Sequence, residues 1–172
     1  MMHQMKHPHP QGGRVATLRA ALGLQPHPEG GDFREWFRSA ASVQPGDARP
    51  SRSALTSIDF LLERGQFSAW HRVASDEAWH LLEGGPLRLW LLPPDLSRLT
   101  HVDLAPVDDA GRAPRHVVPA HWWQAAEPLG AFAYVGATVG PGFDFADFSF
   151  GRDDAALSTA LHQQPGGLAR LL

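Results

Sequence analysis

The sequence predicts an all-β domain, an antiparallel sandwich or barrel with one short helix at each end. From Leu55 onward, short strand-like segments follow one another at spacings of about 8–12 residues, with turn sequences between them. Apolar residues recur at helical spacing only near residues 14–23 and 153–164. The length of 172 residues suits a single domain with a core that needs no disulfide.

The first expected element is a helix that begins near Arg14. Val15, Leu18 and Leu22 lie at helical spacing, and Gly23 stands where a glycine commonly ends a helix. The segment that follows, QPHPEGG, holds two prolines and two glycines and does not continue the helix. Residues 1–13 lack an apolar pattern, so we expect a disordered leader there.

The first expected strand is DFREWFR, because its residues alternate between two faces. Phe33, Glu35 and Phe37 share one face, and the residues between them share the other. DDAALSTALHQQ, at 153–164, is expected to be helical, with Asp153 or Asp154 as its N-cap. Strands are also expected in LTSIDFLL, FSAWHRV, EAWHLLE, LRLWLL, HVDLAPV, RHVVPA, WWQAAE, AFAYVGATV and FDFADFSF.

Composition excludes several classes of function. The net charge is −3 and the pI about 6.3, which does not favour a nucleic-acid or anionic-membrane partner. Without cysteine there is no disulfide, thiolate metal site or thiol nucleophile. The longest apolar runs, such as residues 87–92, are far too short to span a bilayer, and the N-terminus lacks a signal-peptide core. We therefore expect a cytoplasmic protein.

The most informative stretch is residues 65–84, GQFSAWHRVASDEAWHLLEG. His71 shares a strand face with Val73, and Glu77 shares a face of the next strand with Trp79. A tight turn between paired strands would bring His71 and Glu77 together on one side of the sheet. If that side is the interior, the two groups need each other or a metal, because an unpaired buried charge is costly. Alternation points His80 to the outer surface.

The spacing of this stretch resembles the first cupin signature. In that signature a glycine precedes His-x-His by five residues, and a glutamate and a second glycine follow. Gly65, His71, Glu77 and Gly84 match it, and Val73 replaces the second histidine. In the second signature, Gln124 stands at the ligand histidine and His121 at a glycine.

Segments 27–39, 117–126 and 135–148 also resemble the Cupin-5 family, over about Leu22 to Phe150. Asp32 and Asp59 depart from it, because the family more often has an aromatic residue at these positions. The resemblance implies a double-stranded β-helix, the jelly-roll cupin barrel, over residues 14–150, with a helical tail over 151–172. It also implies a homodimer. Most members of the family lack an assigned activity.

A cupin metal set contains three imidazoles and one carboxylate. This chain offers His71, Glu77 and Gln124 at the corresponding positions. An amide oxygen is a weak ligand and valine is none, so a weakly bound divalent metal is possible and a metal-free site is favoured.

Other residues have both a structural and a functional interpretation. Trp79 and Trp122 suit core packing, and the parity of the strands predicts that at least one of them lines the cavity. Thr56 is a candidate hydrogen-bonding contact for a ligand. For His27 and Glu29 a structural role in the glycine turn is favoured slightly over ligand contact. Arg34, Arg38, Arg52, Asp144 and Asp147 are expected at the surface, in salt bridges or in edge packing. One of the three arginines could instead reach an anionic substrate.

Three functions remain open. The first is binding of a small polar molecule, sugar-like or aromatic, near Thr56, His71, Glu77, Trp79, Trp122 and Gln124. The second is a sugar isomerase or epimerase in which His71 and Glu77 act as acid and base. The third is a metal-dependent oxygenase. The sequence does not decide between them or identify the ligand.

Overall fold

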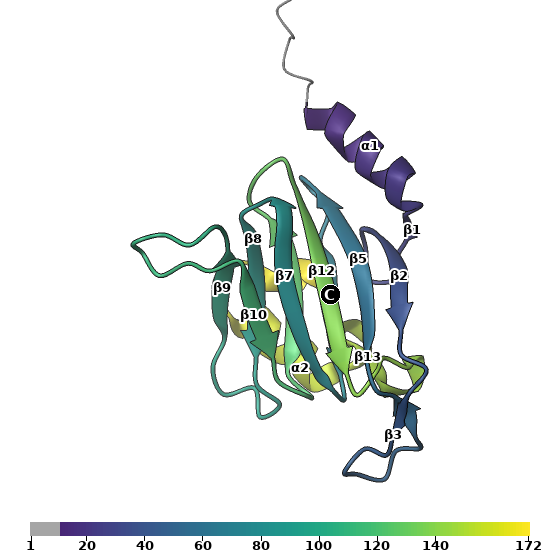
Figure 1. Ribbon diagram of the computed structural model, residues 1–172. Helices are drawn as coiled ribbons and strands as arrows, with labels where there is room; N and C mark the ends of the chain where they lie inside the picture. The colour runs from purple at the N-terminus through teal and green to yellow at the C-terminus, as the bar shows by residue number, and fades with distance from the viewer. Residues whose placement is uncertain (1–10) are drawn as a thin grey trace, which may run out of the picture.

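Two antiparallel sheets packed face to face form the body of the protein. A computed structural model describes residues 11–172, with side chains from residue 13. The six-stranded sheet has the order β1-β2-β5-β12-β7-β10 and faces the viewer in Figure 1. Its strands are β1 (Gln25–Pro26), β2 (Asp32–Arg38), β5 (Thr56–Glu63), β12 (Phe132–Gly140), β7 (Asp76–Gly84) and β10 (Arg115–Val118).

The second sheet has five strands in the order β13-β6-β11-β8-β9. These strands are β13 (Phe148–Phe150), β6 (Ser68–Val73), β11 (Trp123–Pro128), β8 (Leu87–Leu92) and β9 (Thr100–Leu104). A separate hairpin, β3 (Ser42–Val43) with β4 (Arg52–Ser53), projects at one end of the molecule (Figure 1). The predicted all-β jelly-roll architecture is confirmed.

The two α-helices pack against different sheets of the sandwich. Helix α1 (Gln11–Leu22) begins inside the expected leader, whose first ten residues lie outside the described part of the chain. Val15 and Leu18 pack with Leu61 of β5. Helix α2 (Ala155–Gln163) lies behind the six-stranded sheet in Figure 1. Its N-cap is Asp154, whose side chain accepts a hydrogen bond from the Leu157 amide, as one of the two sequence alternatives predicts.

The C-terminal segment continues the core beyond the sandwich. After the 3₁₀ turns η1 (Phe145–Asp147) and η2 (Gly151–Asp153), α2 is followed by a third, η3 (Leu168–Leu171). Leu157 and Leu161 pack with Trp70 and Trp123. The odd–even alternation of β6 and β11 points these two tryptophans out of the sandwich, because His71 and Gln124 point inward. Residues 151–172 therefore cover the outer face of the five-stranded sheet.

The main hydrophobic core lies between the two sheets toward one end. Alternate residues of β5 and β8, such as Phe60, Leu62, Leu87 and Leu89, are almost completely buried there. Inward-facing residues at the other end are smaller or polar, and a cavity forms.

Among the described residues, no helix is long and apolar enough to cross a membrane. Leu82 and Val117 are exposed apolar residues on the outer face of the six-stranded sheet. The homodimer that the family resemblance implies stays a prediction.

The expected hairpin of residues 67–83 does not form, and the structure corrects this point. β6 belongs to the five-stranded sheet and β7 to the six-stranded sheet. Gln124 of β11 lies opposite His71 in the ladder, whereas Val118 of β10 and Val139 of β12 lie opposite Glu77. His71 and Glu77 therefore face each other across the interior and do not stand side by side on one sheet.

The turn between β1 and β2 depends on Gly30. Gly30 has φ +107°, and a Cβ added there would collide with the Phe67 carbonyl oxygen. Gly46, in the loop after β3, has open space around it and no positive φ. We expect Gly30→Ala to lower the free energy of unfolding by about 2 kcal/mol or more, through backbone strain and overlap. Gly46→Ala, the matched control, should change it by less than about 0.5 kcal/mol in denaturant titrations. Equal effects would contradict this account of the turn.

Candidate ligand-binding cavity

A cavity of about 350 Å³ lies between the two sheets and opens toward residues 143–148. Its walls come from both sheets and from the turn before β2. The lining residues are His27, Glu29, Phe33, Glu35, Arg38, Thr56, Ile58, His71, Val73, Glu77, Ala137, Val139, Phe143, Asp144, Phe145 and Phe148. This volume suits a small organic molecule, at the lower end of ordinary ligand sites.

His71 is fixed in one tautomer by the backbone. The residue is 2% exposed, and Nδ1 of its ring lies 2.7 Å from the Ala69 carbonyl oxygen. A carbonyl only accepts, so Nδ1 carries the hydrogen and Nε2 presents a lone pair. Nε2 lies 3.3 Å from Glu29 Oε2, and the other carboxyl oxygen of Glu29 accepts a hydrogen bond from Ser68 Oγ at 2.8 Å. The direct partner of His71 is thus Glu29.

His27 completes this group. Its Nδ1 accepts a hydrogen bond from the Glu29 amide at 3.1 Å, which leaves the hydrogen on Nε2. The ring of His27 packs edge-on against Phe33, with 4.4 Å between centroids. Burial lowers the pKa of His27 to about 4. The imidazole is therefore neutral at physiological pH.

Glu77 reaches the cavity from β7 and is held by a relay of amide and indole groups. Gln124 donates from Nε2 to Glu77 Oε2 at 2.5 Å, and Trp79 donates from Nε1 to Gln124 Oε1 at 2.9 Å. An indole N–H can only donate, so the amide oxygen of Gln124 must face Trp79. The amide hydrogens therefore face Glu77, which fixes the orientation of the Gln124 side chain.

Burial dominates the electrostatics of this site. It raises the pKa of Glu29 from its ordinary value of 4.5 to about 8, against the opposing hydrogen bond from Ser68. It raises the pKa of Glu77 to about 7, although His71 and Gln124 oppose the shift and Glu29 adds to it. Burial also lowers the pKa of His71, despite the charge of Glu77 and the bond to Ala69. The cavity thus holds two carboxyls that titrate near or above neutral pH.

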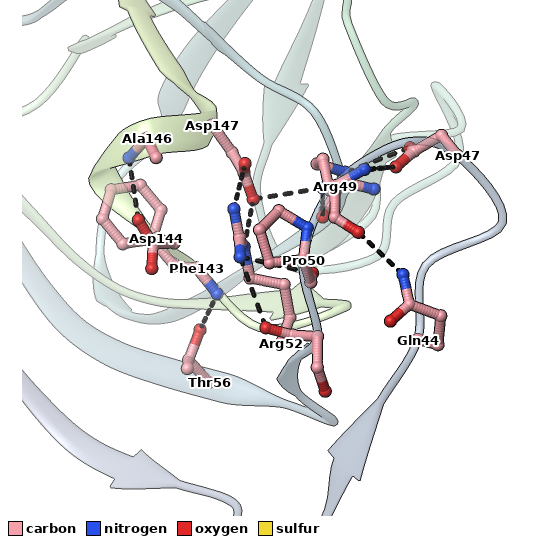
Figure 2. A network of polar contacts seen from close by, with 12 residues as sticks. Gln44, Asp47, Arg49, Pro50, Arg52, Thr56, Phe143, Asp144, Ala146 and Asp147 are labelled. Atoms are coloured by element: carbon pink, nitrogen blue, oxygen red, sulfur yellow. Dashed lines mark hydrogen bonds and ion pairs between the residues drawn. The ribbon is translucent and has the colours of Figure 1, made fainter.

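The mouth of the cavity is an aromatic segment that polar contacts hold in place (Figure 2). Thr56 Oγ1 accepts a hydrogen bond from the Phe143 amide at 2.9 Å. The carboxylate of Asp147 accepts hydrogen bonds from Nε and Nη2 of Arg52, each at 2.8 Å. It accepts another from Nη1 of Arg49 at 3.2 Å. The β3–β4 hairpin is therefore clamped to the segment that carries Phe143, Phe145 and Phe148, and it positions these rings.

Known proteins were compared with this chain on sequence and on structure. The family model described as Cupin superfamily (DUF985), the Cupin-5 family, matches residues 16–151. The chain belongs to the Cupin-5 family. No curated protein matches the sequence of this Cupin-5 chain.

Among solved structures, a hypothetical protein from Leishmania major is 27% identical with a TM-score of 0.81, and the alignment covers 91% of this chain and 97% of that protein. A protein from Shewanella oneidensis is 33% identical with a TM-score of 0.71, over 79% and 83% of the two chains. Oxalate decarboxylase from Bacillus subtilis is 16% identical with a TM-score of 0.53, over 71% of this chain and 28% of that enzyme. This last match supports the cupin fold alone.

The residues of this Cupin-5 chain do not fit the metal of the cupin signatures. Gln124 turns its amide hydrogens toward Glu77, so it offers no ligand atom to a cation that Glu77 would hold. Val73, at the second histidine position, contributes an apolar wall. Within residues 13–172, no three histidine, aspartate or glutamate side chains form a group that could hold a metal ion.

The structure gathers some of the predicted site residues and separates others. Thr56, His71 and Glu77 line the cavity. Gln124 and Trp79 lie one and two hydrogen bonds behind Glu77, and neither lines it. Trp122 packs against the main core instead. The expectation that Trp79 or Trp122 forms a cavity wall therefore differs from the structure, because the relay occupies that space. His80 is exposed, as predicted.

Three residues for which the sequence favoured a structural or surface role line the cavity. Glu29 and His27, favoured for a structural role, line the cavity beside His71. Arg38, expected at the surface or in salt bridges, also reaches the cavity while pairing with Glu35. A register shift between Glu35 and Phe37 reverses the alternation of β2, so Arg38 faces in and Phe37 faces out. The one sequence signal for Glu29 is a carboxyl beside two glycines.

The relay makes Trp79 a reporter of Glu77. We expect the indole N–H resonance of Trp79 to titrate with a midpoint near pH 7, because ionisation of Glu77 polarises Gln124 and then the indole. The measurement is a heteronuclear NMR titration, with Trp79→Phe to assign the signal among six tryptophans. Glu77→Gln should remove the transition. A midpoint near 4.5 would show that Glu77 is not shifted.

The raised pKa of Glu29 also predicts how stability depends on pH. The folded state keeps this proton up to about pH 8, whereas the unfolded chain loses it near 4.5, so its stabilising contribution is lost as pH rises toward 8. Histidines with lowered pKa act in the opposite direction, but below about pH 6.5.

Between about pH 6.5 and about pH 8 we therefore expect the free energy of unfolding to fall by about 1–2 kcal/mol. Denaturant titrations at several pH values measure this change. Glu29→Gln should flatten the profile, and Glu63→Gln, a carboxyl outside the cavity that pairs with Arg19, should leave it unchanged. A profile as steep in Glu29→Gln as in the native chain would contradict the assignment.

Proposed function

We propose that this Cupin-5 protein binds a small polar organic molecule in the cavity between its sheets. The observation that supports this most directly is the burial of Glu29, His71 and Glu77 around one cavity of about 350 Å³. Keeping three such groups buried is costly unless they serve a ligand, because apolar residues of the same size would pack the space more stably. The phenylalanines at the mouth suit the body of a ring-shaped ligand.

A second candidate function is acid–base catalysis of the isomerase or epimerase type. This function is favoured by the presence of one group that can donate a proton and one that can accept a proton in the same cavity. Glu77, with a pKa of about 7, can release or take up a proton near neutral pH. His71 presents the lone pair of a neutral Nε2, held in place by the bond from Nδ1 to Ala69. Proton removal by one group and delivery by the other would require a substrate between them.

One variant separates binding from catalysis. Glu77→Gln keeps an oxygen that can accept from Gln124, and it removes the titrating proton. For a bound neutral ligand found by NMR screening of hydroxylated and aromatic compounds, affinity should change by less than about threefold, since a neutral hydrogen bond is worth only about 1 kcal/mol. Any isomerisation of that ligand should fall by about 100-fold or more.

Glu83→Gln is the matched control, because Glu83 lies on the same strand and pairs with Arg14 outside the cavity. It should change neither quantity. Turnover that survives in Glu77→Gln would remove the acid–base role. A screen in which no compound perturbs the Trp79 signal or the cavity residues would count against ligand binding itself.

A further inference from the structure

Carboxyl groups dominate the charge of the cavity lining. Four carboxyls face the cavity, and the one guanidinium among the lining residues belongs to Arg38. Arg38 is already occupied, because it forms two hydrogen bonds of 2.8 Å to Glu35 and also donates to the Phe143 carbonyl oxygen. His27 and His71 are neutral near pH 7, since burial lowers the pKa of each. The lining residues therefore offer no uncompensated positive charge to an anion.

Two acceptor atoms face the cavity without a hydrogen. Glu77 is 6% exposed, and its Oε1 receives no hydrogen bond from any residue between 13 and 172, whereas Oε2 holds Gln124. The Nε2 lone pair of His71 faces the carboxyl of Glu29, at 3.3 Å, and it is an open acceptor once that carboxyl is ionised. Both residues line the cavity, so a ligand that donates hydrogen bonds would complement these acceptors at the deep end of the cavity.

The mouth of the cavity favours positive charge in a different way. Phe143, Phe145 and Phe148 contact one another edge to face, with centroid separations of 4.9 to 6.1 Å. Phe148 also stacks on His71, with 5.3 Å between centroids. The faces of aromatic rings carry negative partial charge and attract cations. Asp144, at the same rim, adds a carboxylate.

We propose that the cavity selects a small organic cation, an ammonium group carried on an apolar or aromatic body. The ammonium donates its hydrogens to Glu77 and Glu29 at the deep end, and the body lies among the phenylalanines of the mouth. This selectivity rests on the proposed ligand-binding function of the cavity and narrows it to one class of ligand. Anions are disfavoured by the carboxylates, and a neutral polyol satisfies the acceptors without compensating their charge.

Proton release should accompany binding of the cation. An ammonium beside Glu77 and Glu29 favours their ionised forms, so a carboxyl that was protonated gives up its proton when the cation enters. The other charged or titratable groups that face Glu77 across the cavity are His27, Glu35, Arg38, His71 and Asp144. Of these, Glu35 and Arg38 compensate each other, and the two histidines have lowered pKa values.

Three probes of one shape test the proposal: benzylamine, benzyl alcohol and benzoate. They share a ring and differ in charge. Isothermal titration calorimetry on the full chain at about pH 7.5 should show benzylamine binding about tenfold or more tighter than either other probe. Titrations in two buffers with different ionisation enthalpies should show release of protons with benzylamine and none with benzyl alcohol.

Variants of the cavity carboxyls test which residues cause the preference for benzylamine. Glu77→Gln should weaken benzylamine by about tenfold and change benzyl alcohol by less than about threefold. Asp144→Asn, which retains an N-cap side chain for η1, should weaken benzylamine by about twofold to threefold and serves where Glu77→Gln does not fold. Glu83→Gln, outside the cavity on the same strand as Glu77, should leave the order of the three probes unchanged.

The outcomes separate this proposal from the broader one. Benzyl alcohol or benzoate binding as tightly as benzylamine overturns the selectivity for cations and leaves ligand binding in the cavity standing. The proposal is also overturned if Glu77→Gln and Asp144→Asn leave the preference for benzylamine unchanged. The ammonium group would then be recognised by residues outside this cavity lining. If none of the three probes perturbs the NMR signals of the cavity residues, the proposed selectivity for cations is overturned. If a broad screen also finds no ligand, the proposed binding function is overturned as well.

Discussion

The structure depends on how two carboxyl groups are accommodated between two sheets. Glu29 and Glu77 are both more than nine-tenths buried around one small cavity, and neither pairs with an arginine or lysine among residues 13–172. The chain meets the cost of burial with neutral donors, namely Ser68 for Glu29 and Gln124 for Glu77, and with protonation near neutral pH. The cavity is thus kept polar and only partly charged.

The relay behind Glu77 explains why the cupin scaffold here differs chemically from a metal-binding cupin. A histidine at position 124 would aim a nitrogen lone pair into the barrel. Gln124 instead joins Trp79 to Glu77 and turns its hydrogens toward the carboxyl. The same backbone position here supports the buried carboxyl of Glu77, and one fold can carry different sites in this way.

The mouth of the cavity is built by segments far apart in the sequence. The fork of Arg52 on Asp147 ties the β3–β4 hairpin to the aromatic segment (Figure 2). Both side chains are largely buried. Because that ion pair is bidentate and partly buried, it holds the rings of the mouth more firmly than an exposed pair would. The aromatic rim is therefore positioned by the fold itself.

By itself the sequence determined the class of fold, most strand positions, the capped C-terminal helix and the position of His71 and Glu77 at one interior cavity. These depend on local patterns, namely alternation, turn residues and fixed spacings. The pairing of strands was decided only in three dimensions. The turn after Val73 leads β6 and β7 into different sheets. The alternation of apolar and polar residues in either strand does not indicate which strand it pairs with.

The partners of the site residues were likewise decided only by tertiary structure. Glu29 reaches His71 from 42 positions earlier in the chain, and the bulge in β2 reverses which side of that strand faces inward. Strand parity predicts a face only while the register is unbroken, and a contact between distant segments has no local signature. The sequence thus predicts the local elements and some of the polar residues of the cavity, and packing decides which residues meet there.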